Sequence, residues 1–280
     1  MQNNISQFVS VCHNKNADVW KIASKYIIKN INAKNYSVIV PDNEVELFKS
    51  ISHPIFNVIE ESKYLTDFKY FDKLIPHNYL SRKGWYIQQY LKLAFSKDLD
   101  DNEIILIWDA DTIPLKKLNF INKKGQLLFY TGKEFHSPYF TLIKNVLNLN
   151  KAIEGSFISQ CMPLKVSWVH HFYKQLENTH KMKWDYILFS NIDYSEDSGF
   201  SEYETLGTYI FNHFPNEVQL IKNKWSRYGN DFTNGIRTLN PVLIYFLSLR
   251  FDYISFEAWH KCVNQKSIFK IIKNFLFLHK

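Results

Sequence analysis

The stretch Ile104-Ile-Leu-Ile-Trp108, followed by Asp109-Ala-Asp111-Thr-Ile-Pro114, carries the strongest structural signal in the chain. A short apolar run rich in β-branched residues and bounded by polar residues predicts a buried strand. This strand opens directly onto two carboxylates. Ligands of open α/β sheets bind at the carboxyl ends of the strands. Two carboxylates at such a place suit Mg²⁺ or Mn²⁺ on a diphosphate, and the alternative is a strand that simply ends in a polar turn.

The residues before this stretch alternate between strand and helix patterns. Strands are expected at 8–12, 36–40 and 56–59, and helices at 19–31, 44–50 and 85–97. Such alternation predicts βαβ units with right-handed crossovers and a parallel sheet. The expected fold class is therefore α/β.

The second half of the chain mixes both element types. Strands are expected at 126–130, 156–162 and 219–222, and helices at 138–147, 166–180 and 202–213. The sequence contains no internal repeat and no low-complexity linker. We therefore expect one domain over residues 1–240, with residues 241–280 as an aromatic and basic C-terminal extension.

Composition limits the classes of partner. The 280 residues are 46% hydrophobic and 22% charged, which is typical of a globular protein. The net charge of +7 favours anionic partners such as phosphorylated ligands or an anionic membrane face. Zinc-finger spacing and an arginine-rich arm are both missing from the sequence, so nucleic acid is not an expected partner.

The cysteines and the two ends of the chain bear on location. Cys12, Cys161 and Cys262 are far apart and odd in number, which predicts a reducing cytoplasm rather than a disulfide framework. The N-terminus lacks a signal-peptide pattern, and no apolar run is long enough to span a bilayer. The apolar and basic residues 267–280 resemble an interfacial amphipathic helix, although an ordinary packed helix is the alternative. We expect a cytoplasmic protein that is peripheral on the inner face of the cytoplasmic membrane.

Two helix starts carry candidate site residues. Arg82 precedes the helix pattern at 85–97, and cations at a helix N-terminus predict a phosphate site, with a solvated basic turn as the alternative. Ser201 is the expected N-cap of the helix at 202–213. A carboxylate at that helix start could act as the general base on an acceptor hydroxyl. Glu202 is the better candidate, because Glu204 has the spacing of a capping box with Ser201.

The metal ligands follow from the opening stretch. Asp111 is predicted to coordinate the ion directly, where the metal would neutralise charge on a leaving phosphate. Asp109 is predicted to reach the metal through water or to bind a ribose hydroxyl. Glu257 and His260 are the two candidates for a third ligand from the C-terminal part of the chain.

Four segments, taken together and in this order, resemble the bacterial DUF6492 family. They are Arg82–Lys92, Ile107–Leu115, Gly132–Tyr139 and Gly199–Glu204. The family is similar to the metal-dependent GT-A glycosyltransferases of surface-polysaccharide and lipopolysaccharide gene clusters. The resemblance extends from about residue 8 to about residue 260.

The resemblance implies a Rossmann-like GT-A domain, Mn²⁺ or Mg²⁺ as cofactor, and a nucleotide-diphosphate sugar, most simply a UDP-sugar, as donor. The acceptor would be a cell-surface glycan or glycolipid, and the reaction would be inverting. The resemblance maps the metal motif onto Asp109 and Asp111 and the catalytic base onto the segment from Ser201 to Glu204, with Glu202 and Glu204 as its carboxylates. One departure concerns the stretch at 254–259, where relatives carry a histidine and this chain has Glu257, so the third ligand stays open.

This hypothesis assigns the remaining donor contacts. The expected contacts are Val11, Asp18 and Glu60 for the nucleoside, Arg82 with the metal for the diphosphate, and Gln160 with the loop at Tyr139 for the sugar. Gln88 is expected as a further contact of the donor.

Two other functions remain as alternatives. A nucleotidyltransferase also places carboxylates at a strand end, but it would usually carry a Gly-rich, basic loop near the first strand, and residues 11–16 do not provide one. A non-catalytic, membrane-associated carbohydrate-binding protein would explain the aromatic content and the basic C-terminus.

Overall fold

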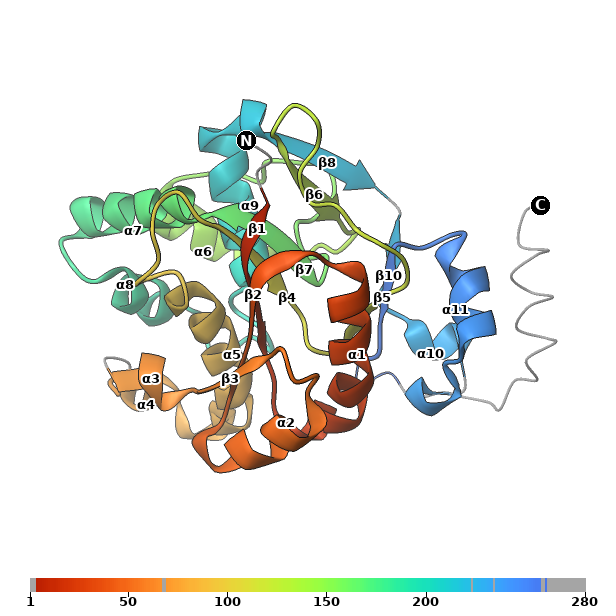
Figure 1. The fold of residues 1–280 in the computed structure, drawn as a ribbon. Coiled ribbons are helices and arrows are strands. Elements are labelled where there is room, and N and C mark those ends of the chain that lie inside the picture. The colour runs from red at the N-terminus through yellow and green to blue at the C-terminus, as the bar shows by residue number, and fades with distance from the viewer. Residues whose placement is uncertain (1–3, 67–68, 223, 234, 258–259, 261–280) are drawn as a thin grey trace.

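The computed structural model describes residues 4–66, 69–222, 224–233, 235–257 and 260. Its central sheet has five strands in the order β3-β2-β1-β4-β7 (Figure 1). These are β1 (Ile5–Val11), β2 (Ala33–Val40), β3 (Asn57–Glu60), β4 (Ile104–Trp108) and β7 (Cys161–Lys165). β1 pairs in parallel with β2 and β4, β2 pairs in parallel with β3, and β7 runs antiparallel to β4. The predicted mostly parallel α/β sheet is confirmed.

Helices flank the sheet on both sides. α1 (Ala17–Asn30) lies on one side, and α5 (Lys83–Ala94), α7 (Val166–His180) and α8 (Trp184–Ser190) lie on the other (Figure 1). The remaining longer helices are α2 (Val45–Ile51), α6 (Ser137–Leu147) and α9 (Glu202–His213). Short helical segments are η1 (Asn14–Asn16), η2 (Asp42–Glu44), α3 (Ser62–Leu65), α4 (Phe71–Leu74), η4 (His77–Arg82), η5 (Pro215–Glu217), α10 (Gly229–Phe232) and η6 (Ile236–Thr238).

Burial explains why the opening stretch is a central strand. All five residues of β4 are buried, because helices cover both faces of the sheet there. The buried side chains of α1 recur at helical spacing and form one helix face; they are Trp20, Ala23, Ser24, Ile27 and Asn30. Because β1 and β4 pair in parallel, their carboxyl ends lie beside each other at one edge of the sheet.

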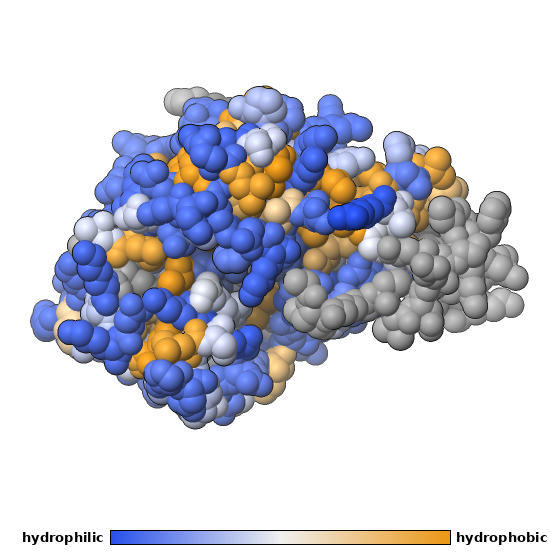
Figure 2. All heavy atoms as spheres, turned by 90° about the horizontal axis from the view of Figure 1, so that it is seen from below, coloured by the Kyte–Doolittle hydropathy of each residue, from blue (hydrophilic) through white to orange (hydrophobic). Residues whose placement is uncertain are grey.

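The parallel strands run toward the lower side of the molecule as drawn in Figure 1. Figure 2 looks onto that side, whose visible surface is mostly hydrophilic with separate apolar patches. This is the edge at which an open α/β sheet binds its ligands.

A second, small sheet joins distant parts of the chain. It contains β5 (Thr112–Pro114), β10 (Tyr253–Ser255) and β9 (Trp225–Ser226), with β10 in the middle. β10 follows helix α11 (Pro241–Ser248) and pairs antiparallel with β5 directly after the Asp109–Asp111 turn. The division expected at residue 240 therefore does not coincide with a break in this sheet. β6 (Leu127–Thr131) and β8 (Val218–Lys222) form a separate parallel pair.

One expected strand differs from the structure. The strand predicted at 156–162 begins only at Cys161, because Gln160 has a left-handed backbone with φ 67°. A strand requires negative φ, so the ladder with β4 cannot extend through this residue. The amphipathic segment expected at 267–280 lies outside the described residues. Of the helices that the structure describes, none combines the length and hydropathy needed to cross a bilayer.

Candidate active site

A cavity of about 370 Å³ lies where β4 ends, between the starts of α5 and α9. We call it the site cavity. Its described lining residues include five carboxylates (Asp109, Asp111, Glu134, Glu202 and Glu257) and three cations (Arg82, Lys92 and Arg227). The carboxylates therefore exceed the cations by two, which is the charge of one divalent cation.

Backbone hydrogen bonds hold the two aspartates in place. The Asp109 amide donates to the Gln160 carbonyl at 2.9 Å, and the Thr112 amide donates to the Asp109 carbonyl at 3.0 Å. The Asp111 carbonyl accepts from the Phe256 amide at 2.9 Å. The turn after β4 is thus hydrogen-bonded to the residue before β7 and to the residue after β10.

Lys92 is the central cation of the site cavity. Its Nζ lies 2.5 Å from Asp109 Oδ1 and 2.6 Å from Glu202 Oε1, and it lies 4.5 Å from the centre of the Tyr203 ring. The Tyr203 hydroxyl donates to the same Asp109 oxygen at 2.7 Å. Burial alone would lower the pKa of Lys92, but the two carboxylates outweigh it and raise the pKa above its ordinary value. Lys92 is therefore charged and connects α5, β4 and α9.

Sequence reasoning missed Lys92 and also Arg227. Lys92 stands between two leucines in the middle of an apolar helix pattern, and a lysine at such a position is a signal for a buried ion pair. The side chain of Arg227 contacts Glu134, and its Nε lies 3.1 Å from Glu257 Oε1.

Glu202 begins α9 and faces the site cavity. Its amide donates to Gln89 Oε1 at 3.0 Å, which satisfies one of the free N–H groups of the helix start. Burial raises the pKa of Glu202, Lys92 opposes that shift, and Asp109 adds to it, with a net rise. A buried carboxylate of raised pKa is a stronger base than an ordinary exposed carboxylate.

Asp111 and Glu257 form the negative centre of the cavity. Burial, Glu257 and Asp109, in that order, raise the pKa of Asp111 well above its usual value. Glu257 is oriented by Gln160, whose Nε2 donates to its Oε1 at 2.9 Å, and by Arg227. The proximity of Asp111 to Glu257 and Asp109 favours a cation beside it.

The donor set fits a hard divalent cation. Asp109, Asp111 and Glu257 would hold Mg²⁺ or Mn²⁺ through carboxylate oxygens. Within the described residues, no group of three or more His, Cys, Asp and Glu side chains is placed so that it could hold a metal ion by itself. Mg²⁺ is usually bound by one or two carboxylates together with substrate phosphates, so an incomplete protein cluster suits a site that the substrate completes.

Most of the predicted site residues come together. Those that line the site cavity are Arg82, Gln88, Asp109, Asp111, Gln160, Glu202 and Glu257. Val11 lines a neighbouring hollow of about 540 Å³, which shares Arg82, Trp85 and Gln88 with the site cavity. The two hollows together could accommodate a ligand with a polar and a less polar part.

Asp18, Glu60 and His260 lie elsewhere. Asp18 is exposed and pairs with Arg237 at 2.7 Å. Glu60 is exposed at the end of β3, and the next residue, Glu61, lines the neighbouring hollow instead. His260 lies 3.3 Å from Asp231 Oδ1 and is not among the residues that line the site cavity. Of the two candidates for a third metal ligand, Glu257 lines the same cavity as Asp111.

Glu204 points away from the site cavity. It is 1% exposed, and its Oε2 accepts from the Ser156 hydroxyl at 2.5 Å and from the Phe157 amide at 3.2 Å. Residues two apart on a helix project about 200° from each other, so Glu202 and Glu204 cannot both face one cavity. The Glu204 amide donates to the Ser201 hydroxyl at 3.2 Å, which caps α9. The position of Glu204 supports a structural role, and its catalytic role stays a prediction.

The loop at 195–199 closes one side of the site cavity. The Arg82 guanidinium donates to the Asp197 carbonyl and lies over the Trp85 ring at 5.4 Å. Ser198 contacts His136 and Tyr139, with the Tyr139 hydroxyl 2.8 Å from the Ser198 hydroxyl. Arg82 thus lines the cavity and also binds the loop at 195–199 that forms one side of it.

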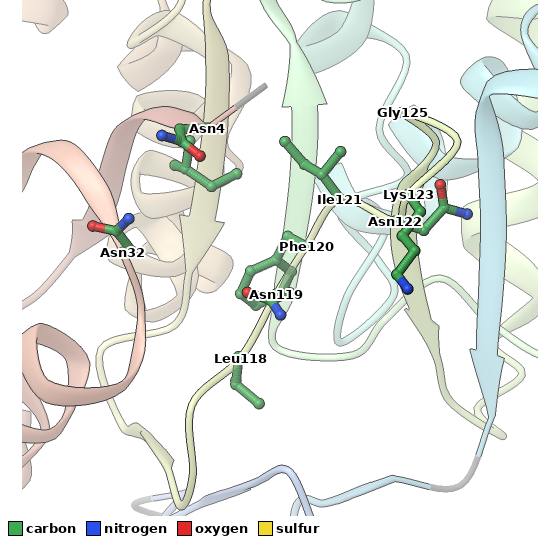
Figure 3. A pocket seen from close by; sticks show the side chains of 10 residues that line it. Asn4, Asn32, Leu118, Asn119, Phe120, Ile121, Asn122, Lys123 and Gly125 are labelled. Carbon is green, nitrogen blue, oxygen red and sulfur yellow. The ribbon is translucent and has the colours of Figure 1, made fainter. Parts of the chain in front are cut away.

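A separate hollow of about 580 Å³ lies at the opposite end of the sheet, near the start of β1 (Figure 3). It is lined by Asn4, Ile5, Asn32, Leu118, Asn119, Phe120, Ile121, Asn122, Lys123 and Gly125. Neutral amides and apolar side chains dominate this lining, and none of these residues is a carboxylate. Although it is larger, it offers neither a general base nor a metal ligand set, so we assign the chemistry to the site cavity.

Comparison with solved structures shows that the fold is similar to that of LgtC, a glycosyltransferase. An active-site mutant of LgtC has a TM-score of 0.50 and 12% identity, over 97% of this chain and 94% of that chain. The galactosyltransferase LgtC in complex with donor and acceptor sugar analogs has a TM-score of 0.49, 11% identity and the same coverage. Mouse xyloside xylosyltransferase 1 has a TM-score of 0.47 and 11% identity, over 91% of this chain and 98% of that chain.

A sequence comparison with family models identifies the family of this chain. The model of a family described as "Family of unknown function (DUF6492)" matches residues 19–239. This chain belongs to that family. Among curated proteins, no sequence matches it.

Proposed function

We propose that the protein is a metal-dependent glycosyltransferase that moves a sugar from a nucleotide-diphosphate sugar to a cell-surface glycan or glycolipid. The observation that carries the proposal is the excess of two carboxylates in the site cavity, placed where the carboxyl end of β4 meets the start of α9. The similarity of the fold to that of the LgtC mutant agrees with it. A UDP-sugar is the simplest donor.

Asp111, Glu257 and Asp109 are the proposed holders of Mn²⁺ or Mg²⁺. The bound ion would neutralise negative charge on the leaving diphosphate. Asp109 shares one of its oxygens with Lys92 and Tyr203, which leaves its second oxygen for the ion or for a water. Among the described residues, the Asp111 carboxylate accepts one long hydrogen bond, from the Thr112 hydroxyl at 3.4 Å, which leaves it able to bind a stronger partner.

Arg82 and Gln88 are the proposed contacts for the diphosphate. Arg82 stands before α5, so its charge and the N-terminus of that helix act on the same region. The nucleoside would occupy the neighbouring hollow at Val11, beside Glu61. The sugar would lie between Gln160 and Tyr139, which both line the site cavity.

Glu202 is the proposed general base. It would accept the proton of the acceptor hydroxyl while that oxygen attacks the anomeric carbon, through an oxocarbenium-like transition state and with inversion. Burial favours the protonated form of Glu202, and the Lys92 ammonium at 2.6 Å favours the ionised form that a base requires. Lys92 is therefore proposed as a positioning residue that keeps the Glu202 carboxylate ionised.

The test is a thermal-shift panel of UDP-, GDP- and CMP-sugars with and without Mn²⁺, followed by donor hydrolysis and transfer assays. We expect one nucleotide sugar to raise the melting temperature only when the metal is present. Asp111→Ala should abolish this shift, whereas the control Glu46→Gln, on an exposed side chain of α2, should keep it. Metal-independent transfer by Asp111→Ala would contradict the proposal.

For the location of the enzyme, we propose the inner face of the cytoplasmic membrane. The support is the sequence of residues 241–280, which contains six Lys and Arg but only two Asp and Glu, a net charge of +4 for that segment. A basic and apolar segment of this kind is typical of attachment to anionic lipid.

A further inference from the structure

Helix α11 is apolar on all of its sides. Its sequence from Pro241 to Ser248 contains no charged residue. Three of its side chains face the protein and are buried, namely Leu243, Ile244 and Leu247. Three others, Val242, Tyr245 and the following Leu249, are 60%, 62% and 62% exposed. We call these last three the α11 surface.

The α11 surface is a concentrated apolar stripe. Val242, Tyr245 and Leu249 are spaced by three and four residues, so they lie along one side of the helix. Among the other large apolar side chains that the described chain exposes, only Met182 and Tyr186 are within four residues of each other, so the α11 surface is the one such group of three. A helix that is apolar all round is normally buried in protein or lipid, so the exposed stripe indicates a partner.

An exposed arginine ends the stripe, and the segment that contains it, residues 241–280, has a net charge of +4 in the sequence. Arg250 follows Leu249 directly and is exposed. Lys116 reaches the C-terminal end of α11, where its Nζ donates to the Ser248 carbonyl at 3.0 Å while pairing with Asp252. In Figure 1, α11 lies at the edge of the described structure, away from the central sheet. A surface that projects in this way can contact a flat partner without obstruction from the main body.

We propose that the α11 surface docks on an anionic lipid bilayer. Val242 and Leu249 would enter the boundary between headgroups and acyl chains, and Tyr245 would place its ring at the same level with its hydroxyl toward water. Arg250 would attract the anionic headgroups. A second copy of the chain is a poorer partner, because a basic surface would then face another basic surface. The inference rests on the proposed function, since a glycolipid acceptor would be presented at the membrane.

The experiment uses the full chain and vesicle flotation. Vesicles of phosphatidylcholine alone are compared with vesicles that also contain phosphatidylglycerol. The test variant is V242S/Y245S/L249S, and the matched control is L47S/I55S/M182S, which removes three exposed apolar side chains from other elements. We expect wild type and control to bind the anionic vesicles, with weaker binding to neutral vesicles and at high salt. The test variant should bind at least about tenfold more weakly, because three apolar insertions are lost.

Three outcomes would overturn the proposal. These are equal binding by the test variant, no flotation of the wild type with either vesicle, or a shift from dimer to monomer in sedimentation of the test variant without any vesicle binding. The metal-dependent thermal shift with nucleotide sugar is measured on the same variants without lipid. That shift tests the glycosyltransferase proposal separately, and the test variant should retain it.

Discussion

Lys92 Nζ lies 2.6 Å from Glu202 Oε1 and 2.5 Å from Asp109 Oδ1, so that one buried ammonium compensates two carboxylates from distant parts of the chain. The pairs are separated by 110 and 17 residues in the sequence. Removing one partner of a buried ion pair leaves an uncompensated charge, which is strongly destabilising. The geometry of the site and the stability of the fold therefore depend on the same side chain.

Lys92→Met should lower the free energy of unfolding by about 3 kcal/mol, because two buried carboxylates lose their cation. Urea denaturation of the metal-free protein measures the change. Lys92→Met combined with Glu202→Gln should recover part of the loss. The control Lys49→Met removes an exposed partner of Glu46 and should change stability by less than about 0.5 kcal/mol. Equal stability of Lys92→Met and wild type would show that the ion pairs are energetically unimportant.

Asp111→Asn should move stability and metal binding in opposite directions. The pKa of Asp111 is raised because burial, Glu257 and Asp109 all disfavour its charge, so a neutral amide of similar shape should stabilise the metal-free protein by about 1 kcal/mol. The same change should abolish binding of Mn²⁺ with nucleotide sugar in calorimetry. If Asp111→Asn destabilised the metal-free protein and retained metal binding, the carboxylate would have a purely structural role.

Two glycine substitutions should have opposite effects. A Cβ at Gly207 would lie 2.1 Å from Phe157 Cγ, so Gly207→Ala should destabilise the protein by about 2 kcal/mol through overpacking between α9 and the 156–160 segment. At Gly84, near the start of α5, a Cβ would meet no atom within 4 Å. Gly84→Ala should therefore stabilise the protein by about 0.5 kcal/mol through helix propensity. Thermal unfolding of both variants checks the contrast, which fails if both shift in the same direction.

Ionisation of Glu204 should lower the free energy of unfolding as the pH rises above about 4.5. Burial raises the pKa of Glu204 from its usual value of 4.5, although Ser156 and Phe157 oppose the shift. Above pH 4.5 the unfolded chain releases the proton that the folded protein retains, so folding is disfavoured progressively until the folded-state pKa is passed. The free energy of unfolding of Glu204→Gln minus that of wild type should therefore be larger at pH 7 than at pH 4, by on the order of 1 kcal/mol. A difference between the variants that does not change with pH would remove this assignment.

The sequence predicted the sheet well, because its signals are local. The buried pattern of 104–108 and the alternating strands and helices before it are periodicities that a short window contains. The strand expected at 156–162 was partly wrong because the left-handed backbone of Gln160 has no signal in hydropathy. The predicted N-cap at Ser201 was confirmed for the same local reason, since a cap involves residues three positions apart.

The sequence by itself determined the order of the βαβ units, the Asp109–Asp111 motif at a strand end and the polar start of α9 at Glu202. Only the tertiary structure decided that Lys92 joins Asp109 to Glu202 and that Glu257 rather than His260 lines the same cavity as Asp111. The physical reason is that periodicity and caps depend on neighbours within a turn or two. Charge compensation in a buried cavity depends instead on which side chains the packed elements bring within a few ångströms, and a linear sequence does not contain that distance.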